Sequence, residues 1–380
     1  MPTVESHTAV NKDDSTPSAS DIAIALKISK SGHRLSTNSN SIEELKYRQN
    51  AETIKDEIKQ VQKKFKDRSF KQAVAEVPKI QNPLNFKTRR LLRGHLTKVL
   101  QIKWIGQSND LLSISPDGQV LFWDTVTGMK TMLKQLPTQW STCVATSPDR
   151  RLLATGGLDN LCIVRSLKNM LQSITLEGHN AYISQCYFLS NGERILTSSG
   201  DHKIILWDIT TAKPIHTFLG HHAEVLNICM SKDELSLLSV SMDKTCRIWD
   251  IRGRSCTRLC EGHSKGVNCA AFFPNDQAFV SGSDDQSCML YDIRAGQYIS
   301  SYIREKVIED AGITSVAFSK SGRLLIVGYE DSKCVVWDTI KPSVILTNLA
   351  HPNKVSAVSV NYNGDALATS CWDCNIRIWN

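Results

Sequence analysis

Histidine, aspartate and small hydroxyl side chains recur at fixed offsets along this 380-residue chain. An aspartate lies 22 residues after each of five histidines, a serine or threonine lies four residues before that aspartate, and a tryptophan or tyrosine lies six residues after it. A carboxylate can accept a hydrogen bond from an imidazole, and a hydroxyl and an indole can extend the network. A buried, charge-assisted bond of this kind is worth about 1.5–3 kcal/mol. The predicted network residues are His95, Asp117, Trp123, His179, Asp201, Trp207, His221, Asp243, Trp249, His263, Asp285, His351, Asp373 and Trp379.

The spacing of the aspartates shows that the chain is built from repeats. They recur as Asp117, Asp159, Asp201, Asp243, Asp285, Asp331 and Asp373, at intervals of 42 residues except for one of 46. A fixed period of this length is the signature of a repeat architecture. Two copies are degenerate: the second has Pro137 in the histidine position and Arg165 in the tryptophan position, and the sixth has Glu309 in the histidine position. Both keep the aspartate and the apolar runs, so the sequence predicts seven repeats.

Each repeat contains the elements that would position this network. Three short runs rich in Val, Ile, Leu and aromatic residues separate the Gly-His pair from the Trp-Asp pair, and a fourth run leads into the next Gly-His. Four antiparallel strands cannot bury both faces alone, but radially stacked sheets can. The pattern therefore predicts an all-β fold, a seven-bladed WD-repeat β-propeller. Residues 87–92 are expected to supply the fourth strand of the last repeat and so to close the ring.

Charge and cysteine content narrow the classes of function. The net charge is +7, but residues 1–90 hold 17 Lys and Arg against 11 Asp and Glu, whereas the remainder holds 28 against 27. A nearly neutral propeller does not indicate a nucleic-acid surface. The twelve cysteines form no framework, and no secretory signal or long apolar run appears, so we expect a reduced, cytoplasmic protein. Cys371 and Cys374 are better explained as small core residues than as a metal or redox site. No metal or cofactor is predicted.

The N-terminal part has a different composition. Residues 1–40 are predicted to be a disordered extension, residues 41–84 a helix and linker, and residues 85–380 the propeller. Ser41 and Glu44 form a capping-box pattern. A heptad seam follows, made of Tyr47, Ala51, Ile54, Ile58, Val61 and Phe65. Such a seam has to be covered, either by coiling with another chain or by lying on the propeller itself.

The network also predicts where function would lie. The histidine loop and the aspartate turn must share one face of the disc, because their side chains are expected to bond. Their neighbours on that face are Trp140, Leu158, Tyr182, Met242 and Trp372, together with Lys98, Glu224 and Asp284. Exposed aromatic residues ringed by charges are typical of a protein-binding surface. No phosphate-binding loop or nucleophile elbow occurs, so we expect that the protein is not an enzyme.

Several short segments indicate which family of WD-repeat proteins this chain resembles. They are residues 87–95 (KTRRLLRGH), 156–160 (GGLDN), 197–201 (TSSGD), 318–325 (FSKSGRLL) and 376–380 (IRIWN). With the heptad helix and the seven repeats, residues 42–380 resemble the β subunit of heterotrimeric G proteins. The alternative that remains is a WD-repeat scaffold or transcriptional corepressor whose N-terminal helix self-associates.

The resemblance implies a set of partners. The helix would coil with a small lipidated γ subunit or a γ-like domain, and the narrow face would bind the GDP-bound α subunit, then effectors once α is released. The protein would lie in the cytoplasm at the inner face of the plasma membrane, held there only through lipidated partners.

The resemblance also implies contact residues. The matching positions are Leu96, Lys98, Lys130, Trp140, Leu158, Asn160, Tyr182, Asn268, Asp284 and Trp372. The departures are Leu100 for an aromatic residue, Gln119 for Lys, Thr142 for Met, Glu224 for Asp, Met242 for Cys and Gly266 for Asp. We keep Glu224 and Met242 among the predicted contacts.

Overall fold

The computed structural model describes residues 47, 50–57, 77–78, 80, 86–137, 140–304, 311–341 and 343–380. The chain divides into two compact units, Met1–Ala75 and Glu76–Asn380. In the first unit residues 50–57 are helical, and the seam residues Tyr47, Ala51 and Ile54 are exposed. The other three predicted seam residues, Ile58, Val61 and Phe65, lie outside the described residues.

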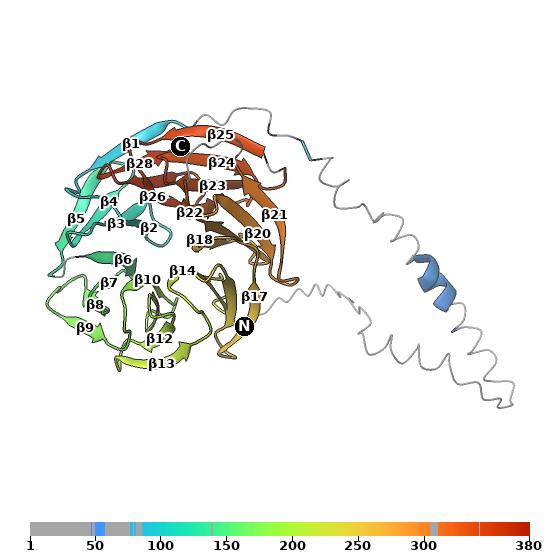
Figure 1. Cartoon of the computed structure of the whole chain (residues 1–380), viewed down its shortest axis with the longest axis horizontal. Helices are drawn as coiled ribbons and strands as arrows, with labels where there is room; N and C mark the ends of the chain where they lie inside the picture. The colour runs from blue at the N-terminus through green and yellow to red at the C-terminus, as the bar shows by residue number, and fades with distance from the viewer. Residues whose placement is uncertain are drawn as a thin grey trace, which may run out of the picture. The chain divides into compact units, whose positions relative to one another are not determined.

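The second unit consists of seven four-stranded antiparallel sheets arranged around a common centre (Figure 1). The predicted seven-bladed propeller is thereby confirmed. Blade 1 comprises β2 (Gln101–Trp104), β3 (Asp110–Ile114), β4 (Gln119–Asp124) and β5 (Met129–Gln135). Blade 2 comprises β6 (Ser141–Thr146), β7 (Leu152–Gly157), β8 (Cys162–Ser166) and β9 (Ser173–Leu176). Blade 3 comprises β10 (Ile183–Phe188), β11 (Arg194–Ser199), β12 (Ile204–Asp208) and β13 (Lys213–Phe218). Blade 4 comprises β14 (Val225–Met230), β15 (Ser236–Ser241), β16 (Cys246–Asp250) and β17 (Ser255–Cys260).

The remaining three blades follow the same order. Blade 5 comprises β18 (Val267–Phe272), β19 (Ala278–Ser283), β20 (Ser287–Asp292) and β21 (Gln297–Ile303). Blade 6 comprises β22 (Ile313–Phe318), β23 (Leu324–Tyr329), β24 (Lys333–Asp338) and β25 (Ser343–Ala350). Blade 7 comprises β26 (Val355–Val360), β27 (Leu367–Cys371), β28 (Asn375–Trp379) and β1 (Thr88–Arg93).

The core lies between the blades. The second strands are buried along almost their whole length, as in β11 and β15, because each is covered on both faces by neighbouring sheets. One cluster joins Leu206 and Phe218 of blade 3 to Val225, Leu237 and Trp249 of blade 4. Each sheet therefore buries its apolar faces only against its neighbours, as the repeat pattern requires.

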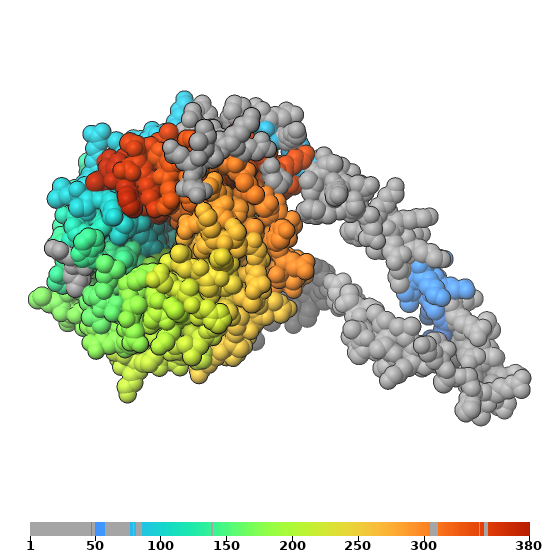
Figure 2. Space-filling model, in the orientation of Figure 1, coloured from blue at the N-terminus to red at the C-terminus, as the bar shows by residue number. Residues whose placement is uncertain are grey.

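Blade 7 closes the ring because it combines β1, the first strand of the propeller sequence, with the last three strands. β1 pairs antiparallel with β28, with Leu92 opposite Ile376, and the Lys87 amide donates to the Asn380 carbonyl at 3.2 Å. Leu92 is 1% exposed. Figure 2 shows the cyan residues of β1 against the red residues of the last blade. The predicted closing strand is confirmed, and the pairing leaves no open junction in the ring.

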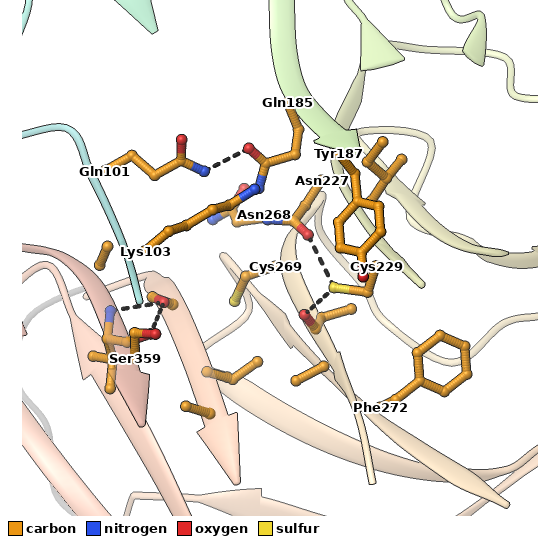
Figure 3. Close-up of a pocket in the computed structure, with 18 of the residues that line it drawn as sticks. Gln101, Lys103, Gln185, Tyr187, Asn227, Cys229, Asn268, Cys269, Phe272 and Ser359 are labelled. Carbon is orange, nitrogen blue, oxygen red and sulfur yellow. Dashed lines mark hydrogen bonds between the residues drawn. The ribbon is translucent and has the colours of Figure 1, made fainter. Parts of the chain in front are cut away.

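The first strands of the blades line a central cavity of about 610 Å³. Several of its polar side chains bond across the blades. The Gln101 amide donates to Gln185 at 2.5 Å (Figure 3). The Lys103 ammonium donates to the Cys186 carbonyl at 3.0 Å. The Cys229 thiol donates to the Ala270 carbonyl at 2.9 Å. The first two bonds join blade 1 to blade 3 across the centre of the disc, and the third joins the neighbouring blades 4 and 5.

Candidate protein-binding face

Blades 3, 4 and 5 share one hydrogen-bond network that joins the histidine to the turn aspartate and to the hydroxyl, and in blades 3 and 4 it extends to the tryptophan. In blade 3, His179 Nδ1 lies 2.9 Å from Asp201 Oδ2 and His179 Nε2 lies 2.8 Å from Thr197 Oγ1. The Trp207 indole donates to the same hydroxyl at 2.8 Å. In a neutral imidazole one ring nitrogen donates and the other accepts. The imidazole then donates to the carboxylate and accepts from the hydroxyl, which itself accepts from the indole.

The equivalent distances in the next two blades are nearly the same. His221 lies 2.8 Å from Asp243 and 2.7 Å from Ser239, and His263 lies 2.9 Å from Asp285 and 2.7 Å from Ser281. Burial lowers the pKa of His221 against the opposing effect of Asp243, which keeps its ring neutral near pH 7.

The aspartates also fix the loops that flank them. Asp201 accepts from the backbone amides of Asn180 at 3.0 Å and Lys203 at 3.1 Å. Burial alone would raise the pKa of Asp201, but the hydrogen bonds from His179 and Asn180 lower it to about 2. The carboxylate therefore stays ionised and holds the histidine loop against the aspartate turn.

Blades 1 and 7 depart from the expected direct contact between histidine and aspartate. In blade 1, His95 Nδ1 lies 2.9 Å from Ser115 Oγ, and that hydroxyl bonds the Asp117 carboxylate. The serine side chain is long enough to insert between the two, so it relays the contact. Burial lowers the pKa of His95 to about 4.

In blade 7 an arginine separates the pair. Arg377 is four residues after Asp373 on the third strand, and its guanidinium lies 2.9 Å from His351 Nδ1 and 2.8 Å from the Asp373 carboxylate. His351 must then accept at Nδ1. Burial and the charge of Arg377 lower the pKa of His351 to about 4.

The degenerate blades replace network members with other side chains. In blade 2, Arg165 donates to Thr155 Oγ1 at 2.9 Å and so takes the role of the missing indole. In blade 6, Arg304 lies 2.9 Å from the Asp331 carboxylate, with its guanidinium 3.7 Å from the Tyr329 ring centroid. Glu309, which occupies the histidine position by sequence, lies outside the described residues.

Blade 6 also lacks the hydroxyl. Val327 stands where the other blades carry Ser or Thr, and the buried Trp337 indole nitrogen has no hydrogen-bond partner among the residues that the structure describes. Among the described residues of the sixth network, Asp331 pairs with the buried Arg304 and with the more exposed Lys333 at 3.7 Å.

Two residues from each blade form what we call the Asp-turn ring: the residue three after the histidine position and the residue before the turn aspartate. Its members are Lys98, Pro116, Trp140, Leu158, Tyr182, Gly200, Glu224, Met242, Gly266, Asp284, Gly312, Glu330, Lys354 and Trp372. In blades 2 to 7 the two members are joined by a backbone hydrogen bond of 3.0–3.2 Å, for example from the Met242 amide to the Glu224 carbonyl. The network and these bonds together place the ring on one face.

Side chains of the ring also link neighbouring blades. Met242 of blade 4 lies over Gly266 of blade 5, and Asp284 of blade 5 lies over Gly312 of blade 6. Glu330 of blade 6 pairs with Lys354 of blade 7. The Trp372 ring of blade 7 is 4.1 Å from Lys98 Nζ of blade 1. The residue before the aspartate thus contacts the next blade's ring member at these four junctions.

The face presents several apolar side chains to solvent. Leu96, Trp140, Leu158 and Met242 are 79%, 58%, 53% and 41% exposed. Tyr182 and Trp372, as well as Lys98, Glu224 and Asp284, are partly buried.

The two aromatic rings are covered for local reasons. Tyr182 packs beside Gly200 and donates to Glu224 at 3.1 Å, and burial together with Glu224 raises the pKa of Tyr182 to about 12. Trp372 lies between two cations, Lys98 at 4.1 Å and Lys354 at 5.1 Å from its ring centroid. These contacts hold both rings in fixed orientations.

Charge is divided across the face. The cations Lys98 and Lys354 lie in blades 1 and 7, whereas Glu224, Asp284 and Glu330 lie in blades 4, 5 and 6. The apolar or aromatic members Trp140, Leu158 and Tyr182 of blades 2 and 3 lie between these two groups along the ring, and such a division of charge would orient a bound protein.

The other predicted contacts lie beside the ring. Asn160 has a positive φ of 63° in the aspartate turn of blade 2. Asn268 donates to Asp284 at 2.5 Å and to the Ile313 carbonyl at 2.9 Å. Lys130 is exposed on the outermost strand of blade 1, 5.8 Å from the Trp123 ring.

Two charged ring members were absent from the predicted contact set. Glu330 and Lys354 form an ion pair on this face, and Lys354 also contacts Trp372. Their positions relative to Asp331 and His351 are the same as those of the predicted residues in other blades, so the repeat offsets alone could have identified them.

Comparison with known proteins agrees with this geometry. A family model described as "G protein beta WD-40 repeat protein" matches residues 41–380. The chain belongs to this family of G-protein β subunits. It is 48% identical over 346 residues to "Guanine nucleotide-binding protein subunit beta" of Lymnaea stagnalis, a match covering 90% of this chain and 100% of the relative. It is 46% identical over 337 residues to "Guanine nucleotide-binding protein G(I)/G(S)/G(T) subunit beta-1" of Homarus americanus, covering 88% and 98%. The predicted resemblance is confirmed, and these matches give no support to the corepressor alternative.

In the part of the β-subunit chain that the structure describes, no helix is long and apolar enough to cross a membrane. No cluster of three or more His, Cys, Asp or Glu side chains within the same residues is arranged to hold a metal ion.

Proposed function

We propose that this chain acts as the β subunit of a heterotrimeric G protein and binds the GDP-bound α subunit through the Asp-turn ring. The observation that carries the proposal is the ring itself, which has exposed apolar residues between a basic and an acidic side. Protein-binding hot spots have this composition, with aromatic anchors inside a polar rim. The same surface would bind effectors after α is released, so the two classes of partner would compete.

The helical part of the first unit suggests a second partner. Tyr47 and Ile54 are 71% and 55% exposed, although both belong to the predicted heptad seam. An apolar seam of this kind is stable when another helix covers it. We assign that helix to a γ subunit or γ-like domain. A lipidated γ would also account for a place at the inner face of the plasma membrane.

We also propose that the chain has no catalytic activity of its own, and that its three parts are the extension 1–40, the helix and linker 41–84, and the propeller 85–380. The histidines and aspartates that might serve as acid or base are bonded within the network, which favours a purely structural use for them.

The test is α binding by single ring variants. Trp140→Ala and Trp372→Ala should each weaken binding of a GDP-bound α subunit by about 2 kcal/mol, roughly 30-fold in Kd. Both should still co-purify with γ. Tyr298→Ala is the matched control, because Tyr298 is 56% exposed on the outermost strand of blade 5. Wild-type affinity in both tryptophan variants would exclude the ring as the α-binding surface.

A further inference from the structure

The Asp-turn ring has no side chain at Gly266, and Met242 of the preceding blade covers this position. The backbone of Gly266 is buried, and its carbonyl accepts from the Asp284 amide at 3.1 Å. A Cβ atom at this position would lie 2.5 Å from Met242 Sδ and 3.3 Å from Met242 Cα. Met242 therefore occupies the space in which any side chain at position 266 would begin.

Met242 nevertheless remains 41% exposed. It is supported from below by Gly266 and fixed at its backbone by the hydrogen bond from its amide to the Glu224 carbonyl, 3.0 Å long. A thioether is polarizable and adapts its shape to a facing apolar group. The Met242 side chain therefore projects into solvent as an apolar group that rests on the Gly266 backbone.

The nearest acidic ring members are already engaged within the protein. Glu224 accepts from the Tyr182 hydroxyl at 3.1 Å, and Asp284 accepts from the Asn268 amide at 2.5 Å. A partner's cation placed over Met242 would lose water without gaining a carboxylate at position 266. Burying a charge against an apolar group is unfavourable, so such a partner would be disfavoured.

We propose that Met242, seated on Gly266, is a specificity-determining contact that accepts an apolar side chain from the bound α subunit. The pair acts as one unit, because a side chain at position 266 requires Met242 to move. This inference rests on the proposed function, since it assigns a particular chemistry to one point of the same binding face.

The experiment measures affinity for a purified GDP-bound α subunit, using the full chain in complex with its γ partner. Met242→Gln keeps the length of the side chain but adds an amide that an apolar partner group cannot pair. We expect about 5- to 10-fold weaker binding. Met242→Leu should bind within about 2-fold of wild type, because volume-conserving apolar exchanges are well tolerated.

Two further variants complete the design. Leu171→Gln makes the same apolar-to-amide change at a residue that is 93% exposed and away from the ring, and should leave binding unchanged. Gly266→Asp should weaken binding at least as much as Met242→Gln, because its Cβ displaces the Met242 thioether. Equal thermal unfolding of all variants would show that each is folded.

The outcomes separate the two proposals. If Met242→Gln and Gly266→Asp both bind like wild type while Trp372→Ala loses binding, the face is correct but the Met242 contact is not. If Trp372→Ala and Trp140→Ala also bind like wild type, the proposed α-binding face itself is wrong.

Discussion

The buried hydroxyl at the centre of the network offers a decisive perturbation. Thr197 Oγ1 lies 2.8 Å from both the Trp207 indole nitrogen and His179 Nε2, and it is fully buried. Thr197→Val keeps the shape of the side chain but removes both bonds. Each buried polar group left unpaired costs about 1–3 kcal/mol, so we expect a loss of about 3 kcal/mol in the free energy of unfolding.

Blade 6 supplies the reverse experiment. Val327 occupies the equivalent position, and no described residue of the chain forms a hydrogen bond with the buried Trp337 indole nitrogen. Val327→Thr would place an acceptor within reach of that nitrogen, with no histidine from its own repeat to satisfy. The net gain of one neutral hydrogen bond is about 1 kcal/mol, so this variant should be more stable than wild type.

Thermal unfolding followed by circular dichroism measures both changes. At roughly 2 °C per kcal/mol for a domain of this size, Tm should fall by about 6 °C in Thr197→Val and rise by about 2 °C in Val327→Thr. The two substitutions exchange the same pair of isosteric side chains in opposite directions, so each is the control of the other. A loss below about 1 kcal/mol in Thr197→Val would refute the reasoning that the network contributes to stability.

Three further predictions concern other parts of the structure. The pKa values of His95 and His351 are lowered to about 4 in the folded protein, so between pH 4 and pH 6.5 the unfolded chain binds more protons than the folded chain. The contribution of these two histidines to the free energy of unfolding should therefore be fully present above pH 6.5 and fall towards pH 4, as measured by urea midpoints across that range. Asp331→Ala should lower the free energy of unfolding by about 3 kcal/mol, because it removes the carboxylate that pairs with the buried Arg304. Asp110→Ala breaks the more exposed pair with Arg150 and should lower it by less than about 1 kcal/mol in the same denaturation assay. Leu92→Ala should cost about 2–4 kcal/mol and increase proteolysis of residues 86–93 relative to wild type, because Leu92 packs the strand that closes the ring.

The repeat period explains why so much of the fold could be predicted from the sequence. A period of 42 residues with a turn aspartate in every copy determines the number of blades, and residues 87–92 occupy the position of a fourth strand just before the first Gly-His pair. These predictions depend on spacing alone. They hold even for blade 2, whose Pro137 and Arg165 depart from the pattern, because its strands keep their apolar residues.

The finer contacts could not be predicted, because they depend on which side chain reaches a given atom. Nothing in the spacing shows that Ser115 would insert between His95 and Asp117, or that Arg377 would separate His351 from Asp373. Arg304 pairs with Asp331 although it lies 27 residues before it, rather than the 22 of the other copies. Long side chains reach across several residues, so three-dimensional packing decides between competing partners.

The stabilising network and the proposed binding face share the same loops. Asp201 accepts from the Asn180 amide, and two residues later Tyr182 accepts through its carbonyl from Gly200 and reaches Glu224 with its hydroxyl. A change in the network would therefore shift the ring members that a partner contacts. Met242→Gln changes an exposed side chain and should leave the melting temperature unaltered. Network variants such as Thr197→Val should lower both stability and affinity, and this difference separates residues that bind a partner from residues that hold the binding face in place.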